Sequence, residues 1–325
     1  MQMEQYLDEL RSVVNVDCGT QTRKGVAQIA DIFTRLYRDA GWHAEQVDLG
    51  EQVGPGVSDM KSGLLNILWA LRGLEETDRQ HLRIAVAMNP DEETGSVHSH
   101  QWIGELAKRS GCVLVCEAAR ADGSLVKARK GMARYRLDFH GVAAHAGNDP
   151  EKGRSAITAL AHAIIAINQL ADSAKGTTLN VGVISGGDAA NIVPDHAQAV
   201  VDLRFWCNDE YQRVSQALQA RCQQPFLEGV SCELHQDAHT PAMAPSADTE
   251  ALMARVEQAG REEGIAITWQ AVGGGSDANH TAALGIPSLD GFGPIGAGFH
   301  SPAEYLELES IAPRVRLLRR VIASL

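Results

Sequence analysis

Apolar positions in the first third of the chain follow two patterns, one typical of helices and one of strands. Residues 23–40 carry Val, Ile, Phe and Leu along one stripe, and residues 61–74 are apolar nearly all round, so both segments predict helices. The apolar runs at 82–88 (LRIAVAM) and 113–116 (VLVC) predict strands, with a helix at 96–110 between them. This alternation of strand and helix predicts a mainly parallel sheet covered by helices.

The middle of the chain has a different pattern, in which apolar and polar residues alternate. Residues 134–140 (RYRLDFH) and 197–205 (AQAVVDLRF) alternate as strands with one wet face do. Residues 155–171 and 210–224 are typical of helices. Together these elements predict an α+β insert at 131–237.

Beyond the insert the α/β pattern resumes. It predicts helices at 249–263, 277–284 and 310–324, and strands at 265–271 and 286–289. Pro287 removes one ladder donor from the last strand. The fold class is therefore α/β, with a discontinuous, mainly parallel-sheet domain (1–130 and 238–325) interrupted by a smaller α+β domain.

Composition excludes several classes of partner. The 325 residues include 29 Lys and Arg against 41 Asp and Glu, and the resulting charge of −12 repels nucleic acids and anionic membranes. No apolar run reaches the ~18 residues of a membrane helix, and the first residues are too acidic for a signal peptide. The six cysteines have no framework spacing, which favours free thiols in a reducing cytoplasm.

Four acidic residues stand next to predicted strands and helices. Asp59 lies between a Gly/Pro-rich turn and a buried helix, where an N-cap is the ordinary interpretation. Glu92 and Glu93 follow the strand at 82–88, and Glu117 ends the next strand. As an alternative to an acidic loop, one such carboxylate would bind a metal while its neighbour takes a proton from water.

Further polar residues stand in glycine-rich or alanine-rich segments. His300 occurs in GFHSPAEYLEL, His145 in HGVAAHAGNDPEKGRSA, Asn191 in NIVPDHA, Arg204 in VDLRF and Gly275 in GGGSDAN. Each of them, taken alone, is ordinarily a loop polar group or part of a flexible turn.

Taken together, these segments resemble the M20 family of zinc-dependent exopeptidases and amidohydrolases, and within it glutamate carboxypeptidases of the carboxypeptidase G2 type. Seven blocks carry the resemblance, in family order: GPGVSDMKSG, NPDEETGS, VCEAA, KGMARYRLDFHGVAAHAGNDPEKGRSAI, NIVPDHAQAVVDLRF, GGGSDAN and GFHSPAEY. The resemblance implies a catalytic domain of zinc-exopeptidase type and an inserted dimerisation or lid domain.

The resemblance also implies roles for the acidic residues and for His300. Asp59 would bridge two zinc ions, Glu93 and His300 would complete one metal site, and Glu117 would belong to the other. Glu92 would be the general base that takes a proton from water and returns it to the leaving amine. Cobalt or manganese could replace zinc at such oxygen and imidazole ligands.

The remaining roles implied by the resemblance concern the substrate and the partner subunit. His145 would stabilise the tetrahedral oxyanion, reaching the site of the second subunit of a homodimer formed through the insert. Asn191, Arg204 and Gly275 would hold the substrate, with Arg204 offering a bidentate fork to its terminal carboxylate.

One expected motif is absent. The family carries H-x-D ahead of the GPGVSDMKSG block, supplying a ligand to the second zinc, whereas residues 48–53 here pass straight into that block. The absent segment amounts to roughly 40–60 residues at ordinary strand and loop lengths. We therefore expect one well-formed zinc site from Asp59, Glu93 and His300, and a weak or vacant second site at Asp59 and Glu117.

These observations predict a cytoplasmic metallohydrolase that cleaves the amide bond of small peptides or N-acyl amino acids and releases a C-terminal, glutamate-like amino acid. Three alternatives stay open: an N-acyl amino acid deacylase, a non-catalytic homologue that keeps the metal-binding or dimerising surfaces, and an enzyme that has lost an internal segment. The chain geometry at residues 50–54 would separate the last alternative from the others.

Overall fold

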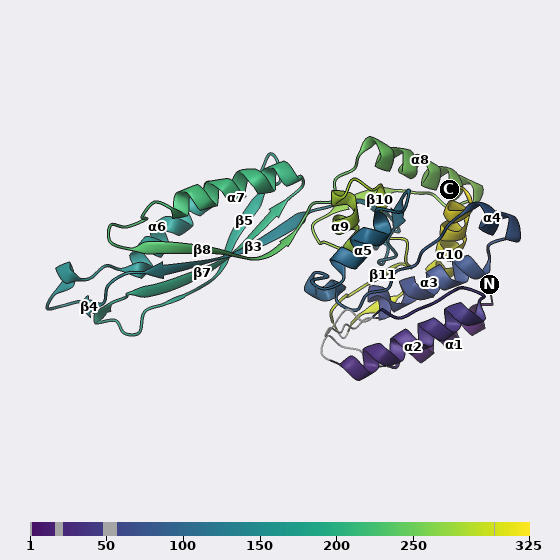
Figure 1. The fold of residues 1–325 in the computed structure, drawn as a ribbon, viewed down its shortest axis with the longest axis horizontal. Coiled ribbons are helices and arrows are strands. Elements are labelled where there is room, and N and C mark those ends of the chain that lie inside the picture. Colours follow the sequence, from purple (N-terminus) through teal and green to yellow (C-terminus); the bar gives the residue numbers. More distant parts are fainter. Residues whose placement is uncertain (1, 17–21, 48–56, 302) are drawn as a thin grey trace. The chain divides into compact units, whose positions relative to one another are not determined.

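A computed structural model describes residues 2–16, 22–47, 57–301 and 303–325. The junction at residues 50–54 lies outside the described residues. The chain divides into two compact units (Figure 1): unit 1 comprises Met1–Ala128, Ala244–Val272 and Ser276–Leu325, and unit 2 comprises Arg129–Met243 and Gly273–Gly275. The insert predicted at 131–237 falls within unit 2.

Helices provide most of the regular secondary structure of unit 1. They are α1 (Met3–Val14), α2 (Arg23–Asp39), α3 (Ser62–Arg72), α4 (Glu76–His81), α5 (His100–Ala107), α8 (Ala247–Glu262), α9 (Asp277–Ala283) and α10 (Leu308–Ala323). The α3 segment, apolar nearly all round, is buried as predicted: Leu65, Leu68 and Leu71 pack in one core with Leu317 and Leu318 of α10. In the described part of the chain, no helix is long and apolar enough to cross a membrane.

The strands of unit 1 are short. β1 (Val113–Leu114) pairs in parallel with β10 (Ser288–Leu289), β2 (Leu125–Arg129) lies beside β9 (Trp269–Val272), and β11 (Gly296–Ala297) pairs with β12 (Tyr305–Leu306). The parallel pair and the surrounding helices agree with the predicted α/β class. The strands predicted at 113–116, 265–271 and 286–289 form only in part.

The strand prediction at 82–88 is wrong. This segment lies against the core through alternate residues, Leu82, Ile84, Val86 and Met88, but it is not assigned to any ladder. The alternation of apolar residues therefore correctly predicts that one face of this segment packs against the core. A β-strand also needs a hydrogen-bonded neighbouring strand, which alternation alone does not predict.

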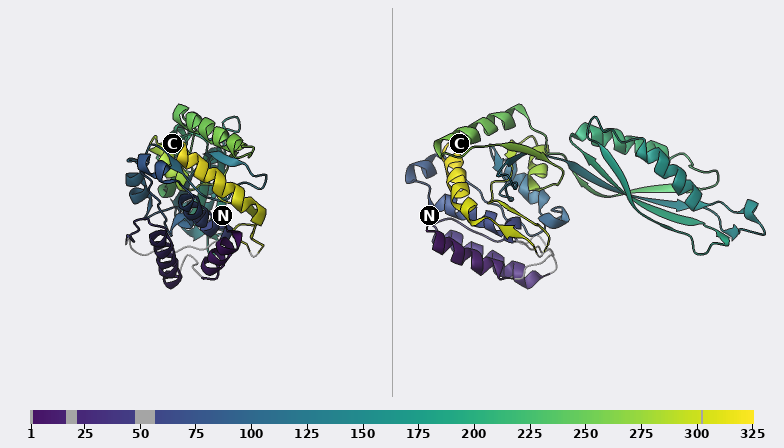
Figure 2. Two further views of the ribbon diagram at one scale, coloured as in Figure 1. Left: turned by 90° about the vertical axis from the view of Figure 1, so that its right-hand side faces the viewer. Right: turned by 180° about the vertical axis from the view of Figure 1, so that it is seen from behind.

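Unit 2 is a four-stranded antiparallel sheet with two helices on one face (Figures 1 and 2). The strand order is β5 (Thr178–Gly186), β7 (His196–Phe205), β3 (Gly131–His140) and β8 (Ser231–Thr240), covered by α6 (Ala156–Asn168) and α7 (Asn208–Cys222). A two-stranded ladder of β4 (Ala144–His145) and β6 (Ile192–Val193) extends from one end. The sequence analysis predicted β3, β7 and both helices but missed the edge strands β5 and β8.

Glu210 at the start of α7 provides a test of how unit 2 is stabilised. It is buried and accepts hydrogen bonds from Arg213 Nη2 at 2.7 Å, Lys175 Nζ at 2.7 Å and Thr177 Oγ1 at 2.8 Å. The bonds from Arg213 and Lys175 lower the pKa of Glu210 from 4.5 to about 2. A lowered pKa in the folded state means that this stabilisation is complete above pH ~4.5 and is lost as the pH falls toward ~2.

We expect Glu210→Gln to lower the free energy of unfolding by about 2 kcal/mol at neutral pH, because the charged bonds are lost. The difference from wild type should shrink as the pH falls below ~4.5. Urea unfolding at neutral and acidic pH measures both effects, with the exposed Glu228→Gln as the control. A difference that does not depend on pH would contradict the assignment.

Candidate metal and catalytic site

The turn that carries Glu92 and Glu93 is fixed by a buried aspartate. Asp91 Oδ2 accepts the backbone N–H of His98 at 2.8 Å and of Ser99 at 3.2 Å, and its Oδ1 accepts the Ser99 hydroxyl at 2.5 Å. Burial alone would raise the pKa of Asp91, but these hydrogen bonds hold it below its usual value. Asp91 is therefore a structural anchor for the one-turn 3-10 helix Glu92–Thr94 that follows it.

Asp59, Glu93 and His300 come together in unit 1 from three distant parts of the chain. His300 Nε2 lies 3.0 Å from Asp59 Oδ2 and 3.1 Å from Glu93 Oε2. One ligand atom from each residue lies within 4.8 Å of the others, and this is the one such group of three in the described ranges. His300 has φ +60°, an uncommon backbone conformation for a residue other than glycine that is often found at functional sites.

These three residues fit a zinc ion. Zinc bonds of ~2.0–2.2 Å to oxygen and nitrogen in a tetrahedron place neighbouring donors roughly 3.3 Å apart, close to the separations seen here. The carboxylates of Glu93 and Asp59 raise the pKa of His300. The pKa of Glu93 is also raised, by burial and by the charge of Asp59. A bound cation would relieve the repulsion between the two carboxylates.

Glu117 lies beside this group in the buried interior. Its backbone is held by two close glycines, since a Cβ on Gly63 would lie 2.0 Å from the Cys116 oxygen, and one on Gly293 would lie 2.7 Å from the Glu117 oxygen. Burial and the charge of Asp290 raise the pKa of Glu117 well above its usual range, and the nearby Asp59 carboxylate acts in the same direction. In the segments that the structure describes, no third ligand joins Asp59 and Glu117.

Glu92 is set apart from its neighbour by its environment. Burial raises its pKa to about 8, with further contributions from Asp277, Glu93 and Asp59. A carboxyl group with such a pKa can both accept and release a proton near neutral pH. Glu92 thus has the pKa that suits an acid–base catalyst, whereas Glu93 lies close enough to Asp59 and His300 to be a metal ligand with them.

Three acidic residues near the site were not singled out from the sequence. Asp290 is fully buried and accepts the Ser276 hydroxyl at 2.6 Å, Asp277 accepts the Ser96 hydroxyl, and Glu304 Oε1 accepts the Asp59 backbone N–H at 3.1 Å. Asp290 directly follows β10. Glu117 was singled out from the sequence because it ends a predicted strand, and the same criterion could have identified Asp290.

His145 and Asn191 lie together in unit 2: His145 is the last residue of β4, and Asn191 directly precedes its partner strand β6. The Ala146 backbone N–H donates to the Asn191 oxygen at 2.9 Å. His145 Nδ1 accepts the backbone N–H groups of Gly147 and Asn148, both at 3.1 Å. With Nδ1 an acceptor, the proton of a neutral ring must be on Nε2, which is then a donor on an exposed side chain.

Arg204 lies at the other end of the unit 2 sheet. The register pairs His196 with His140 near the β4 end and Arg204 with Met132 at the opposite end, so one protomer does not bring Arg204 to His145. Arg204 Nε donates to Asp202 Oδ2 at 2.8 Å. Gly275 is exposed, and its carbonyl oxygen accepts a hydrogen bond from Arg129 at 3.2 Å.

Comparison with known proteins gives matches over most of the chain. Residues 127–230 match a family model described as "Peptidase dimerisation domain" of the M20 type. Carboxypeptidase G2 from a Pseudomonas species is 31% identical over 284 residues, which cover 86% of this chain and 68% of that protein. Succinyl-diaminopimelate desuccinylase from Paracoccus denitrificans is 26% identical over 293 residues, covering 83% of this chain and 73% of that protein.

Solved structures share the fold at lower identity. Aminopeptidase PepT from Bacillus cereus superimposes with a TM-score of 0.78 at 22% identity, covering 100% of this chain and 99% of that one. A tripeptidase from Staphylococcus aureus gives a TM-score of 0.79 at 18% identity, covering 99% and 98%.

Proposed function

The chain belongs to the M20 peptidase family, and we propose that it hydrolyses the amide bond of small peptides or N-acyl amino acids that end in a free carboxylate. The observation that carries the proposal is the group of Asp59, Glu93 and His300, with Glu92 beside it. The similarity to carboxypeptidase G2 makes the release of a C-terminal, glutamate-like residue our first candidate reaction.

Asp59, Glu93 and His300 would hold a zinc ion, as their donor atoms and separations suit it. Bound there, zinc would make water more acidic and polarise the scissile carbonyl. Glu92 would take the proton from the attacking water and deliver it to the leaving amine, because its environment favours both protonation states.

The residues of unit 2 would bind and orient the substrate. In a homodimer, His145 would reach the site of the second subunit, where its Nε2–H would donate to the oxyanion, with Asn191 beside it. Arg204 would pair with the substrate carboxylate through the guanidinium nitrogens that Asp202 does not engage, and the backbone at Gly275 would line the site.

We further propose that the protein is a homodimer that associates through α6 and the edge strand β5. Ile165 on α6 is 62% exposed, and Val183 and Ile184 on β5 are each 60% exposed. The helix packs over β5, which has no partner on its outer edge among the described residues. An apolar helix stripe beside an open strand edge is a self-complementary surface for a two-fold dimer.

We expect Ile165→Glu to shift the protein from dimer to monomer, because it places a charge in the apolar interface. Sedimentation velocity over a range of concentrations measures the change. Leu284→Glu, at a 44% exposed apolar residue of unit 1, is the matched control and should stay dimeric. Dissociation of the control, or a dimer in the Ile165 variant, would contradict this surface.

The proposed activity is tested by incubating the zinc-loaded protein with dipeptides and with N-acetyl amino acids, each ending in glutamate or in leucine. Faster release of glutamate from the peptide supports a carboxypeptidase. Faster release from the N-acetyl compound supports an N-acyl amino acid deacylase, the alternative favoured by the relatedness to a desuccinylase. Turnover of none of these compounds would contradict the proposed hydrolase.

A further inference from the structure

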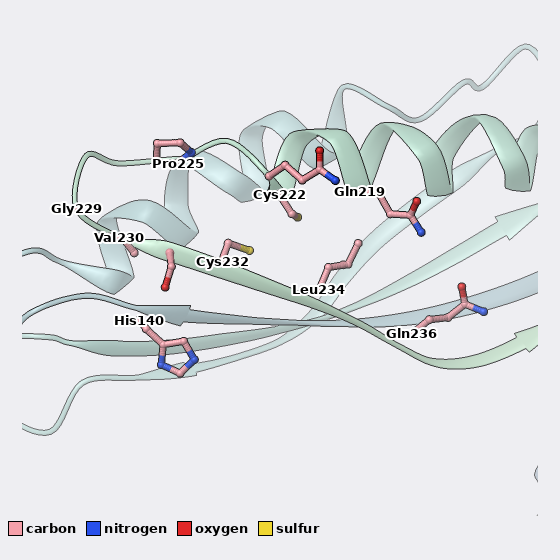
Figure 3. Close-up of a pocket in the computed structure, with 11 residues that line it drawn as sticks. His140, Gln219, Cys222, Pro225, Gly229, Val230, Cys232, Leu234 and Gln236 are labelled. Atoms are coloured by element: carbon pink, nitrogen blue, oxygen red, sulfur yellow. The ribbon is translucent and has the colours of Figure 1, made fainter.

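Two cysteines from different elements meet in a groove of unit 2. Cys222 is the last residue of α7, and Cys232 lies on the edge strand β8, opposite Phe139 of β3. Figure 3 shows the groove, which has a volume of about 800 Å³. Polar side chains of His140, Gln219, Gln223 and Gln236 line it together with the two thiols.

The two side chains are neighbours. Both lie between α7 and β8 on the groove (Figure 3), and each thiol shifts the pKa of the other. Both side chains are half-buried and pack against the core of unit 2, so their positions are fixed by packing. Both also line the groove, so a small molecule can reach them.

We propose that Cys222 and Cys232 form a reversible dithiol site, which a small-molecule disulfide such as glutathione disulfide oxidises to an intramolecular disulfide. The Cys222 thiolate attacks one sulfur of the oxidant, whose S–S bond breaks and releases the first thiol. Cys232 then loses its proton and attacks the Cys222 sulfur, which releases the second thiol. Two electrons pass from the protein to the oxidant, and both protein S–H hydrogens end on the released thiols.

The surroundings of the two sulfur atoms assign these roles. The neighbouring Cys232 thiol and the nearby charge of Arg221 lower the pKa of Cys222, against the effect of its burial. The neighbouring Cys222 and burial raise the pKa of Cys232. Cys222 is therefore the attacking thiol and Cys232 the resolving thiol.

The disulfide would tie the end of α7 to β8, two elements that already pack together. It would close the loop at 223–231 and so restrict the unfolded chain. We therefore expect the oxidised protein to melt at a higher temperature than the reduced protein.

The test treats the zinc-loaded wild-type protein with glutathione disulfide and maps its peptides by mass spectrometry without reduction. The expected result is a peptide pair linked through Cys222 and Cys232, a loss of two titratable thiols from this pair, and recovery of both with dithiothreitol. The exposed Cys207 serves as the internal control and should give only a mixed disulfide.

One variant tests the order of the steps. Cys232→Ser should trap a mixed disulfide on Cys222, because no second thiol is left to release it. The proposal is overturned if both thiols of the wild type stay free while Cys207 reacts, or if Cys222 of the wild type accumulates the mixed disulfide. The wild-type result decides the main question even if a variant fails to fold.

Discussion

The Glu92→Gln variant is expected to lose amide hydrolysis by about 10²–10⁴-fold, the usual contribution of a general acid–base catalyst. Glutamine preserves the size of the side chain at this position, but it cannot take a proton from water. The three proposed zinc ligands, Asp59, Glu93 and His300, are unchanged, so zinc content should stay at the wild-type level. Initial rates at saturating substrate, together with metal analysis of the same samples, measure both quantities.

Glu76→Gln is a suitable control for Glu92→Gln, since Glu76 is exposed and lies on α4, which carries none of the proposed site residues. It should retain wild-type turnover and zinc content. Unchanged turnover of Glu92→Gln would contradict the assignment of Glu92 as the base. A joint loss of zinc and activity would instead indicate that Glu92 supports the metal site.

The His300→Ala variant is expected to lose zinc and activity together. It removes one of three ligands and leaves two carboxylates that repel one another. We expect zinc binding to weaken on the order of 100-fold or more, since changes outside the ligand set already cost 10–100-fold in metal sites. Competition with a zinc-binding dye measures the affinity.

His43→Ala is the control for His300→Ala. His43 is the only histidine that precedes Asp59 in the sequence, and its side chain is 89% exposed. If His43 supplied the ligand that the absent H-x-D segment would provide, the His43→Ala substitution would weaken the binding of a second zinc ion. We expect no change in zinc binding, and a lost ion would show that the second site is completed by His43.

The structure brings together three residues that the motifs singled out, whereas part of the predicted sheet does not form. Motif order pointed to Asp59, Glu93 and His300, which are far apart in the chain yet within hydrogen-bonding distance in the structure. Residues such as Asp91 and Asp290 were not identified, because a buried carboxylate that anchors a turn has no motif of its own. Their roles depend on hydrogen bonds that only the folded chain displays.

The errors in the fold have a common physical cause. Strand formation depends on a partner, so the apolar run at 82–88 packs on the core without forming a ladder. The missed strands β5 and β8 lie at the edges of their sheet, where exposure permits polar residues such as His235 and Gln236 and weakens the apolar alternation. Strands inside the sheet, such as β3 and β7, keep that alternation and were predicted.

The number of zinc ions bound per chain tests the central claim most directly. The claim is that Asp59, Glu93 and His300 form one complete metal site, while no third ligand joins Asp59 and Glu117 among the residues that the structure describes. Isothermal titration of the metal-free protein with zinc should therefore give one tight site per chain, which is absent from His300→Ala. Two tight sites per chain in the wild type would contradict the account.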